Sequence, residues 1–94
     1  MKQVQAEVIS NQQLHHQVYL LWLKAPDLTA AAPGQFFMIR CGEGYEPLLR
    51  RPLSLHRKHG EQVALLYRVK GKGLAWLSQR AEGETIDVLG PLGK

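Results

Sequence analysis

Short stretches of alternating apolar and polar residues, separated by turn-forming residues, recur along this chain of 94 residues. In the first stretch Val4, Ala6 and Val8 alternate with polar neighbours, which is typical of a half-buried β-strand. Five further stretches have the length and composition of strands. The pattern therefore predicts six strands, at residues 4–10, 16–24, 35–41, 51–57, 62–69 and 85–89.

The segments between these stretches are short and rich in turn residues. Residues 11–13, Asn-Gln-Gln, and residues 58–61 are predicted as hairpin turns, and residues 25–34 and 42–47 as loops. The segment 71–80 places apolar residues at helical spacing. Many short strands with close turns favour a closed barrel, which removes exposed edges. We expect an all-β fold, a six-stranded antiparallel Greek-key barrel with one short helix between the fifth and sixth strands.

The composition, 45% hydrophobic and 21% charged, is that of a soluble globular protein. The longest apolar run, residues 18–23, is far shorter than the roughly 20 residues that span a bilayer, and the N-terminus does not resemble a signal peptide. We expect a cytoplasmic protein. Cys41 is the only cysteine, so the chain has neither an internal disulfide nor the four thiolates that an iron-sulfur cluster usually needs.

Positive charge is concentrated in the middle of the chain. Between Arg50 and Lys72 there are seven basic residues and one acidic residue, a net charge of +6, while the rest of the chain carries −2. A compact anion such as a pyrophosphate would fit this distribution, and so would a nucleic acid. Aromatic residues are only 7% of the chain, and Tyr67 alone lies in the basic window, so no row of stacking side chains supports binding of single-stranded nucleic acid.

The segment Arg51-Pro52-Leu53-Ser54 lies in the fourth predicted strand. Strand alternation places Arg51 and Leu53 on one face and Pro52 and Ser54 on the other. A guanidinium offers a planar set of donors that suits a phosphate, and proline cannot donate to a sheet, so this segment is typical of the wall of a ligand site. Arg51 is the candidate ligand of a pyrophosphate, although a surface arginine would give the same pattern.

Glycines precede the predicted helix. Gly71 and Gly73 flank Lys72, and a helix N-terminus with exposed amides binds anions, which glycine allows to approach closely. Gly-x-Gly alone is a weak motif, since a simple turn between a strand and a helix produces it as well. No nucleophile with a base and no paired carboxylates point to a catalytic residue. The four histidines have no metal-ligand spacing.

Taken in order, Arg51-Pro52-Leu53-Ser54, Tyr67-Arg68-Val69, Gly71-Lys72-Gly73 and Gly90-Pro91-Leu92-Gly93 resemble the FAD-binding domain of the ferredoxin-NADP reductase superfamily. Within it the chain is most similar to the electron transfer subunits of dihydroorotate dehydrogenase. The resemblance implies that ten residues bind FAD, namely Arg51, Pro52, Leu53, Ser54, Leu66, Tyr67, Arg68, Gly71, Gly73 and Leu74. Ser54 would lie near the flavin N5 edge and the backbone of Pro52 and Leu53 along the ring. The segment Leu66, Tyr67 and Arg68 would touch the ribityl and adenosine parts.

One position departs from the pattern of that family. Leu74 follows Gly73 where a threonine is usual, so one hydroxyl donor to the phosphates is missing. Tyr67 has a second interpretation, as a core or rim aromatic. Arg68 also has a second interpretation, as a strand residue exposed to solvent.

The resemblance also implies a role. In full-length relatives the flavin domain would pass electrons between NAD(H) and a catalytic dehydrogenase subunit by way of a [2Fe-2S] cluster, in the oxidation of dihydroorotate during pyrimidine biosynthesis. Electron transfer subunits of a hydrogenase or of a sulfide-linked reductase are alternatives. The chain stops where relatives continue into a nicotinamide-binding domain, so residues 1–94 are expected to be an isolated FAD-binding barrel. Such a fragment would have little activity alone and could form a homodimer.

Overall fold

The computed structural model describes residues 2–43 and 49–93, which form six strands, one α-helix and one short 3-10 helix. The elements follow the chain in the order β1 Lys2–His15, β2 Val18–Lys24, η1 Pro26–Ala30, β3 Phe36–Arg40, β4 Arg50–His59, β5 Gln62–Arg68, α1 Gly71–Ser78 and β6 Thr85–Leu92. All six predicted strands and the predicted helix are present, with ends that differ by a few residues.

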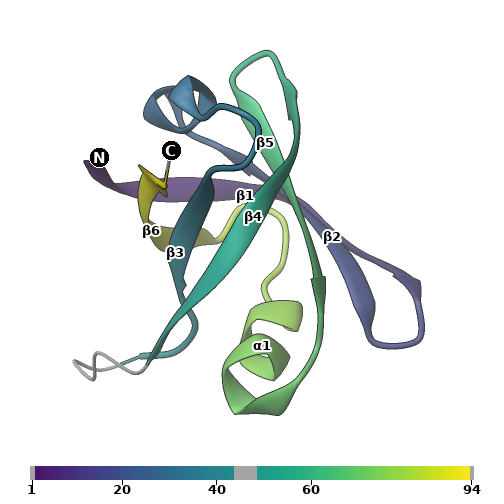
Figure 1. Ribbon diagram of the computed structural model, residues 1–94. Helices are drawn as coiled ribbons and strands as arrows, with labels where there is room; N and C mark the ends of the chain where they lie inside the picture. Colours follow the sequence, from purple (N-terminus) through teal and green to yellow (C-terminus); the bar gives the residue numbers. More distant parts are fainter. Residues whose placement is uncertain (1, 44–48, 94) are drawn as a thin grey trace.

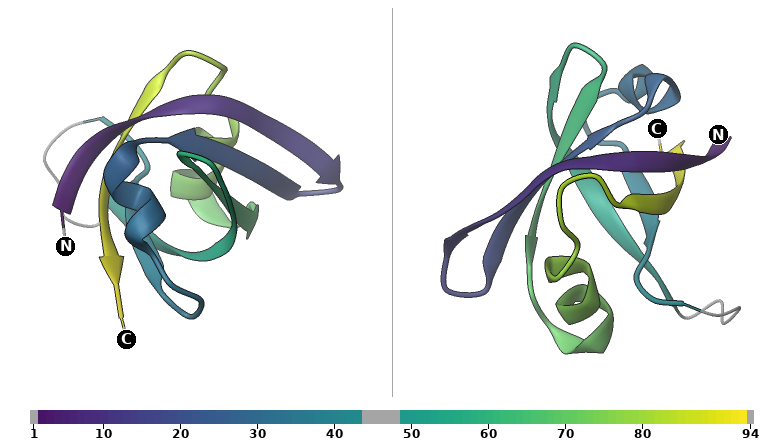
Figure 2. Two further views of the ribbon diagram at one scale, coloured as in Figure 1. Left: turned by 90° about the horizontal axis from the view of Figure 1, so that it is seen from above. Right: turned by 180° about the vertical axis from the view of Figure 1, so that it is seen from behind.

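The strands close into a barrel in the order β1-β2-β5-β4-β3-β6, and every neighbouring pair is antiparallel. Figures 1 and 2 show α1 at one end of the barrel and η1 at the other. The predicted six-stranded antiparallel barrel is therefore confirmed, with the helix between β5 and β6.

The barrel interior is filled by the apolar residues of the alternating pattern. Phe37 and Ile39 of β3 are fully buried, as are Val63 and Leu65 of β5. No described polar or charged residue is buried in this core. Burying a side chain of this size contributes roughly 1.5–3 kcal/mol. The period of two in the sequence thus decides which face of each strand points inward.

The first hairpin differs from the prediction, because residues 11–13 do not form its turn. Strand β1 continues to His15, and Asn11, Gln12 and Gln13 pair with Leu21, Leu20 and Tyr19. The chain turns instead at residues 16–17, where Gln17 has a φ of 62°. The pairing of β1 with β6 ends at Glu7, so the hairpin extends beyond the barrel. Polar residues are tolerated in this part of β1 because its side chains remain exposed or only half-buried.

Two smaller differences concern the loops. The predicted loop 25–34 contains η1, which starts at Pro26, a residue suited to the first helical position. Most of the predicted loop 42–47 lies outside the described residues. No helix in the described part of the chain is long and apolar enough to cross a bilayer.

Candidate functional site

Strands β4 and β5 separate at one end of the barrel. They pair from Leu55↔Leu65 to His59↔Gln62. Before Leu55, β4 pairs only with β3, and after Leu65, β5 pairs only with β2, as far as the described residues show. Figure 1 shows the two strands diverging, with α1 at the open end. The backbone edges of residues 50–54 and 66–68 therefore do not pair with each other, and we call this gap in the strand pairing the opening between β4 and β5.

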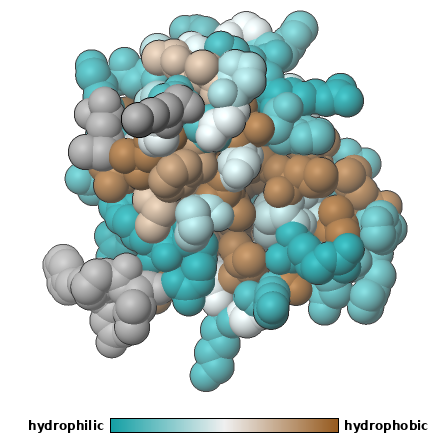
Figure 3. All heavy atoms as spheres, viewed as in Figure 1, coloured by the Kyte–Doolittle hydropathy of each residue, from teal (hydrophilic) through white to brown (hydrophobic). Residues whose placement is uncertain are grey.

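The predicted alternation along β4 is confirmed. Leu53 is buried and Arg51 is half-buried, whereas Pro52 and Ser54 are exposed on the outer face. On β5, Leu66 is 41% exposed and Arg68 is also exposed. Four of the predicted ligand contacts, Pro52, Ser54, Leu66 and Arg68, thus lie on the outer face of the two diverging strands, whereas the side chains of Leu53 and Tyr67 point into the core. Figure 3 shows apolar side chains among polar ones across this side of the molecule.

Arg51 lies against the first turn of α1. A Cβ atom added to the buried Gly73 would lie 3.4 Å from Nε of Arg51 and 3.5 Å from its Cζ, so the guanidinium packs on the glycine. Its Nη1 donates a hydrogen bond of 3.0 Å to the carbonyl of Arg50. The structure therefore brings together two sequence motifs, the arginine of β4 and the glycines of the first turn of α1.

No described side chain caps the start of α1. Lys70, the N-cap residue, makes no capping hydrogen bond, and the first turn contains no acidic residue. The first amides of a helix have no partner within the helix and carry a partial positive charge. With Arg51 beside them and Lys72 in the same turn, they form a positively charged surface suited to an anion.

Cys41 lies next to this contact. A Cβ atom on Gly73 would be 3.4 Å from Cβ of Cys41. Burial raises the pKa of the Cys41 thiol to about 11, and the charge of Arg51 opposes this shift only in part. The thiol is therefore protonated at neutral pH and packs as a small apolar group.

Tyr67 and Leu74 point away from the outer face. Tyr67 is buried and stacks on Tyr19 with ring centroids 5.7 Å apart. Its hydroxyl donates a hydrogen bond of 3.0 Å to Oδ1 of Asn11, and burial raises its pKa. Leu74 packs against the core, which explains why an apolar residue is accepted at this position. Asn11 was missed by the sequence reasoning, which placed it in a turn.

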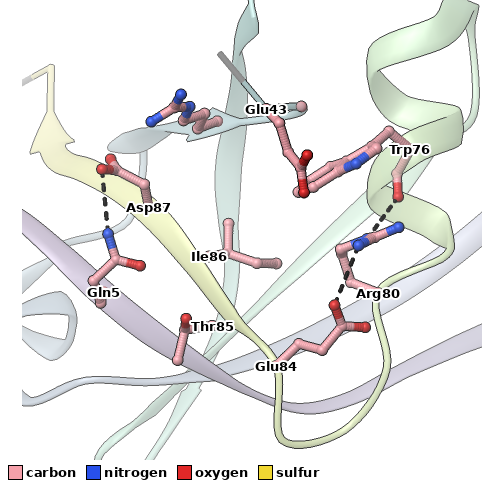
Figure 4. Close-up of a pocket in the computed structure, with 10 residues that line it drawn as sticks. Gln5, Glu43, Trp76, Arg80, Glu84, Thr85, Ile86 and Asp87 are labelled. Carbon is pink, nitrogen blue, oxygen red and sulfur yellow. Dashed lines mark hydrogen bonds and ion pairs between the residues drawn. The ribbon is translucent and has the colours of Figure 1, made fainter. Parts of the chain in front are cut away.

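An open pocket of about 310 Å³ lies elsewhere, between β1, β6 and the C-terminal half of α1. Figure 4 shows Trp76, Arg80 and Glu84 at one side of it. The Arg80 guanidinium lies 4.1 Å from the centre of the Trp76 ring and donates to Glu84 at 3.2 Å. None of the residues predicted to bind a cofactor lines this pocket.

Asp87, at the other side of this pocket, accepts a hydrogen bond of 2.6 Å from Arg50 and one of 2.9 Å from Gln3. Burial raises the pKa of Asp87, but the hydrogen bonds from Gln3 and Arg50 and the charges of Arg50 and Arg40 lower it more, so the net shift is downward. Arg50 is thus engaged in an ion pair with Asp87. No three His, Cys, Asp or Glu side chains cluster as a metal site would require in the part of the chain described.

Comparison with known proteins agrees with this architecture. No protein-family model matches the chain. The chain is 44% identical over 93 residues to the electron transfer subunit of dihydroorotate dehydrogenase B (NAD(+)) of Desulforamulus reducens, covering 95% of this chain and 35% of that protein. It is 42% identical over 97 residues to the subunit of the same name from Bacillus pumilus, covering 99% of this chain and 37% of that protein. The chain is a homologue of these electron transfer subunits.

The chain spans about a third of the length of the homologous subunits that it matches. A solved structure supports the same relationship at the level of the fold. The structure of an NADH-dependent reduced ferredoxin-NADP oxidoreductase, studied for flavin-based electron bifurcation, superposes with a TM-score of 0.84 and 33% identity. The superposed part covers 95% of this chain and 34% of the chain in that solved structure. The barrel is therefore of the ferredoxin-NADP reductase type.

Proposed function

We propose that this chain is the FAD-binding barrel of an electron transfer subunit. The observation that carries the proposal is the contact of the Arg51 guanidinium with Gly73, in the first turn of α1 and beside the opening between β4 and β5. An arginine and a set of helix amides that converge on one surface suit a pyrophosphate, since both bind phosphate oxygens through charge-assisted hydrogen bonds.

The pyrophosphate of FAD has a counterpart in this arrangement. In the proposal the pyrophosphate binds Arg51 and the backbone of Gly71 and Gly73, with Leu74 beside it. The side chain of Leu74 packs on the core and its amide makes the first hydrogen bond of the helix, to the N-cap residue Lys70, so this residue borders the phosphates through its backbone without donating to them. The backbone amides thus replace the hydroxyl that a threonine would supply.

The flavin ring and ribityl chain would lie along the diverging strands. Pro52, Leu53 and Ser54 provide one edge of the opening, and Leu66 and Arg68 provide the other. The exposed side chains of Pro52 and Leu66 offer apolar contact, and the Ser54 hydroxyl offers a hydrogen bond to the ring. The side chain of Tyr67 is held in the core and would support the site from behind.

The wider role is proposed from the homologues. When bound, the flavin supplies both hydride and single-electron transfer, while the protein binds and orients it. We place the full-length protein in the cytoplasm, moving electrons between NAD(H) and a catalytic dehydrogenase subunit through flavin and a [2Fe-2S] cluster, in dihydroorotate oxidation. The names of the curated homologues support this role, because they include dihydroorotate dehydrogenase, NAD(+) and electron transfer.

The test is a titration of the chain with FAD, FMN and riboflavin, followed by absorption and fluorescence. FAD is expected to bind more tightly than riboflavin, which has no phosphate. Replacing Arg51 by alanine removes a charged contact of roughly 1.5–3 kcal/mol, so the Kd for FAD should rise about 10- to 150-fold. The Kd for riboflavin should be nearly unchanged.

The control is Arg57→Ala, on the exposed, paired end of the same strand. This variant should bind FAD as the wild type does. Equal losses of affinity in the two variants would show a general effect of positive charge and would contradict a specific role of Arg51. Absence of FAD binding by the wild-type chain would overturn the proposal.

A further inference from the structure

Helix α1 is too short to hold its own position. It has eight residues, and isolated helices of this length are not stable in water. Its first turn lies against Arg51, and Leu77 near its C-terminus is buried in the core. The direction of its N-terminal amides therefore depends on how its C-terminal half is attached to the barrel.

Asn11 makes that attachment. Its Nδ2 donates hydrogen bonds of 2.8 Å to the carbonyl of Leu77 and 3.0 Å to the carbonyl of Arg80. The Leu77 carbonyl lies in the last turn of α1, where carbonyls have no partner within the helix, and the Arg80 carbonyl lies two residues beyond the helix end at Ser78. One amide nitrogen therefore joins β1 to the end of α1 and to the segment that follows it. Figure 2 shows the β1–β2 hairpin and α1 on the same side of the barrel.

The orientation of the Asn11 amide is fixed by a third contact. The Tyr67 hydroxyl donates to Oδ1 of Asn11 at 3.0 Å, and Tyr67 is itself held by stacking on Tyr19. An amide rotated by 180° would place its nitrogen against the hydroxyl and its oxygen against two carbonyls, which would repel it. The three hydrogen bonds therefore connect β5, β1 and the end of α1 in one arrangement.

We propose that Asn11 is a positioning residue for the phosphate site. This inference rests on the proposed function, because it assigns to Asn11 the orientation of the helix that would bind the pyrophosphate. Asn11 contacts the C-terminal end of α1, and the proposed anion site is at the opposite end, about 10 Å away for a helix of this length. Asn11 therefore acts through the helix and touches no ligand.

The test compares FAD with riboflavin in Asn11→Leu, which keeps the approximate size of the side chain and removes all three hydrogen bonds. Loss of helix orientation should raise the Kd for FAD about tenfold and leave the Kd for riboflavin within about twofold, because riboflavin lacks the phosphate. Tyr67→Phe removes only the hydroxyl and should give a smaller rise for FAD. Hydrogen exchange of the α1 amides should be faster in both variants.

The matched control is Leu28→Ala, which removes buried apolar atoms in η1, at the end of the barrel remote from α1. It should lower the melting temperature without changing the ratio of the two Kd values. If the wild type binds FAD and Asn11→Leu binds it equally well, or loses FAD and riboflavin alike, Asn11 has only a structural role. If the wild type does not bind FAD, the proposed function fails, and this inference fails with it.

Discussion

Replacing Gly73 by alanine should make the protein more stable and its flavin binding weaker. Alanine is favoured over glycine inside a helix by roughly 0.5–1 kcal/mol. The added Cβ would lie 3.4–3.5 Å from Arg51 and Cys41, which is ordinary van der Waals contact, so no clash offsets this gain. For a domain of this size the melting temperature should rise by roughly 2–8 °C.

The same methyl group would cover part of the surface that Arg51 and the helix start present together. Weakening one charge-assisted contact of roughly 1.5 kcal/mol should raise the Kd for FAD about tenfold. The melting temperature is measured by circular dichroism and the Kd by fluorescence titration, on the same preparation. General damage to the fold would lower both the melting temperature and the affinity for FAD. A rise in melting temperature together with a rise in Kd would therefore show that the substitution acts on the site.

Ala75→Gly is the matched control, because residue 75 is exposed in the same helix. It should lower the melting temperature by a similar amount and change the Kd for FAD by less than about twofold. A Gly73→Ala variant that melts at a higher temperature and binds FAD as tightly as the wild type would refute the idea that the Arg51–Gly73 contact borders the phosphates.

Three other predictions concern stability. Asp87→Asn should cost roughly 1.5–3 kcal/mol at pH 7, because the pair with Arg50 is largely buried. Since the pKa of Asp87 is lowered by folding, its contribution is present above its ordinary value of 3.8 and is lost as the pH falls below that value. The difference in melting temperature between wild type and variant should therefore shrink as the pH falls below 3.8 and the carboxyl is protonated in the folded protein, and a constant difference would contradict the assignment. Gly90→Ala would place a Cβ atom 2.7 Å from Cδ1 of Phe37, and chemical denaturation should show a loss of roughly 1–3 kcal/mol. Gln17→Gly should stabilise the protein by up to about 1 kcal/mol in the same assay, since a φ of 62° is strained for glutamine, and a loss of stability would show that the turn depends on this side chain.

The barrel could be predicted from the sequence because its strands alternate and its turns contain glycine and proline. This reasoning failed at residues 11–13, where three polar residues continue a strand. Local patterns report whether a side chain is compatible with water. They do not report whether a hairpin extends beyond the barrel, where strand residues remain exposed. Asn11 was missed for the same reason, since its three partners are 56 to 69 residues away in the sequence.

The candidate site could likewise be predicted from the sequence only in part. Arg51 and Gly73 were singled out by residue type and spacing, and the structure brings them together. The alternation along β4, however, placed Arg51 and Ser54 on opposite faces, which is difficult to reconcile with one ligand. The divergence of β4 from β5 offers a solution, because a long ligand can follow the opening from the helix to the outer face. This divergence depends on pairing between distant strands, and a single sequence contains no direct record of it.

The opening between β4 and β5 also has a consequence for how the protein should behave during purification. Strand edges that lack a partner can pair with an edge of another molecule, which leads to aggregation. A flavin lying along residues 50–54 and 66–68 would cover both edges at once. Excess FAD during cell lysis and chromatography would then increase the yield of monomer, and storage without it would favour self-association.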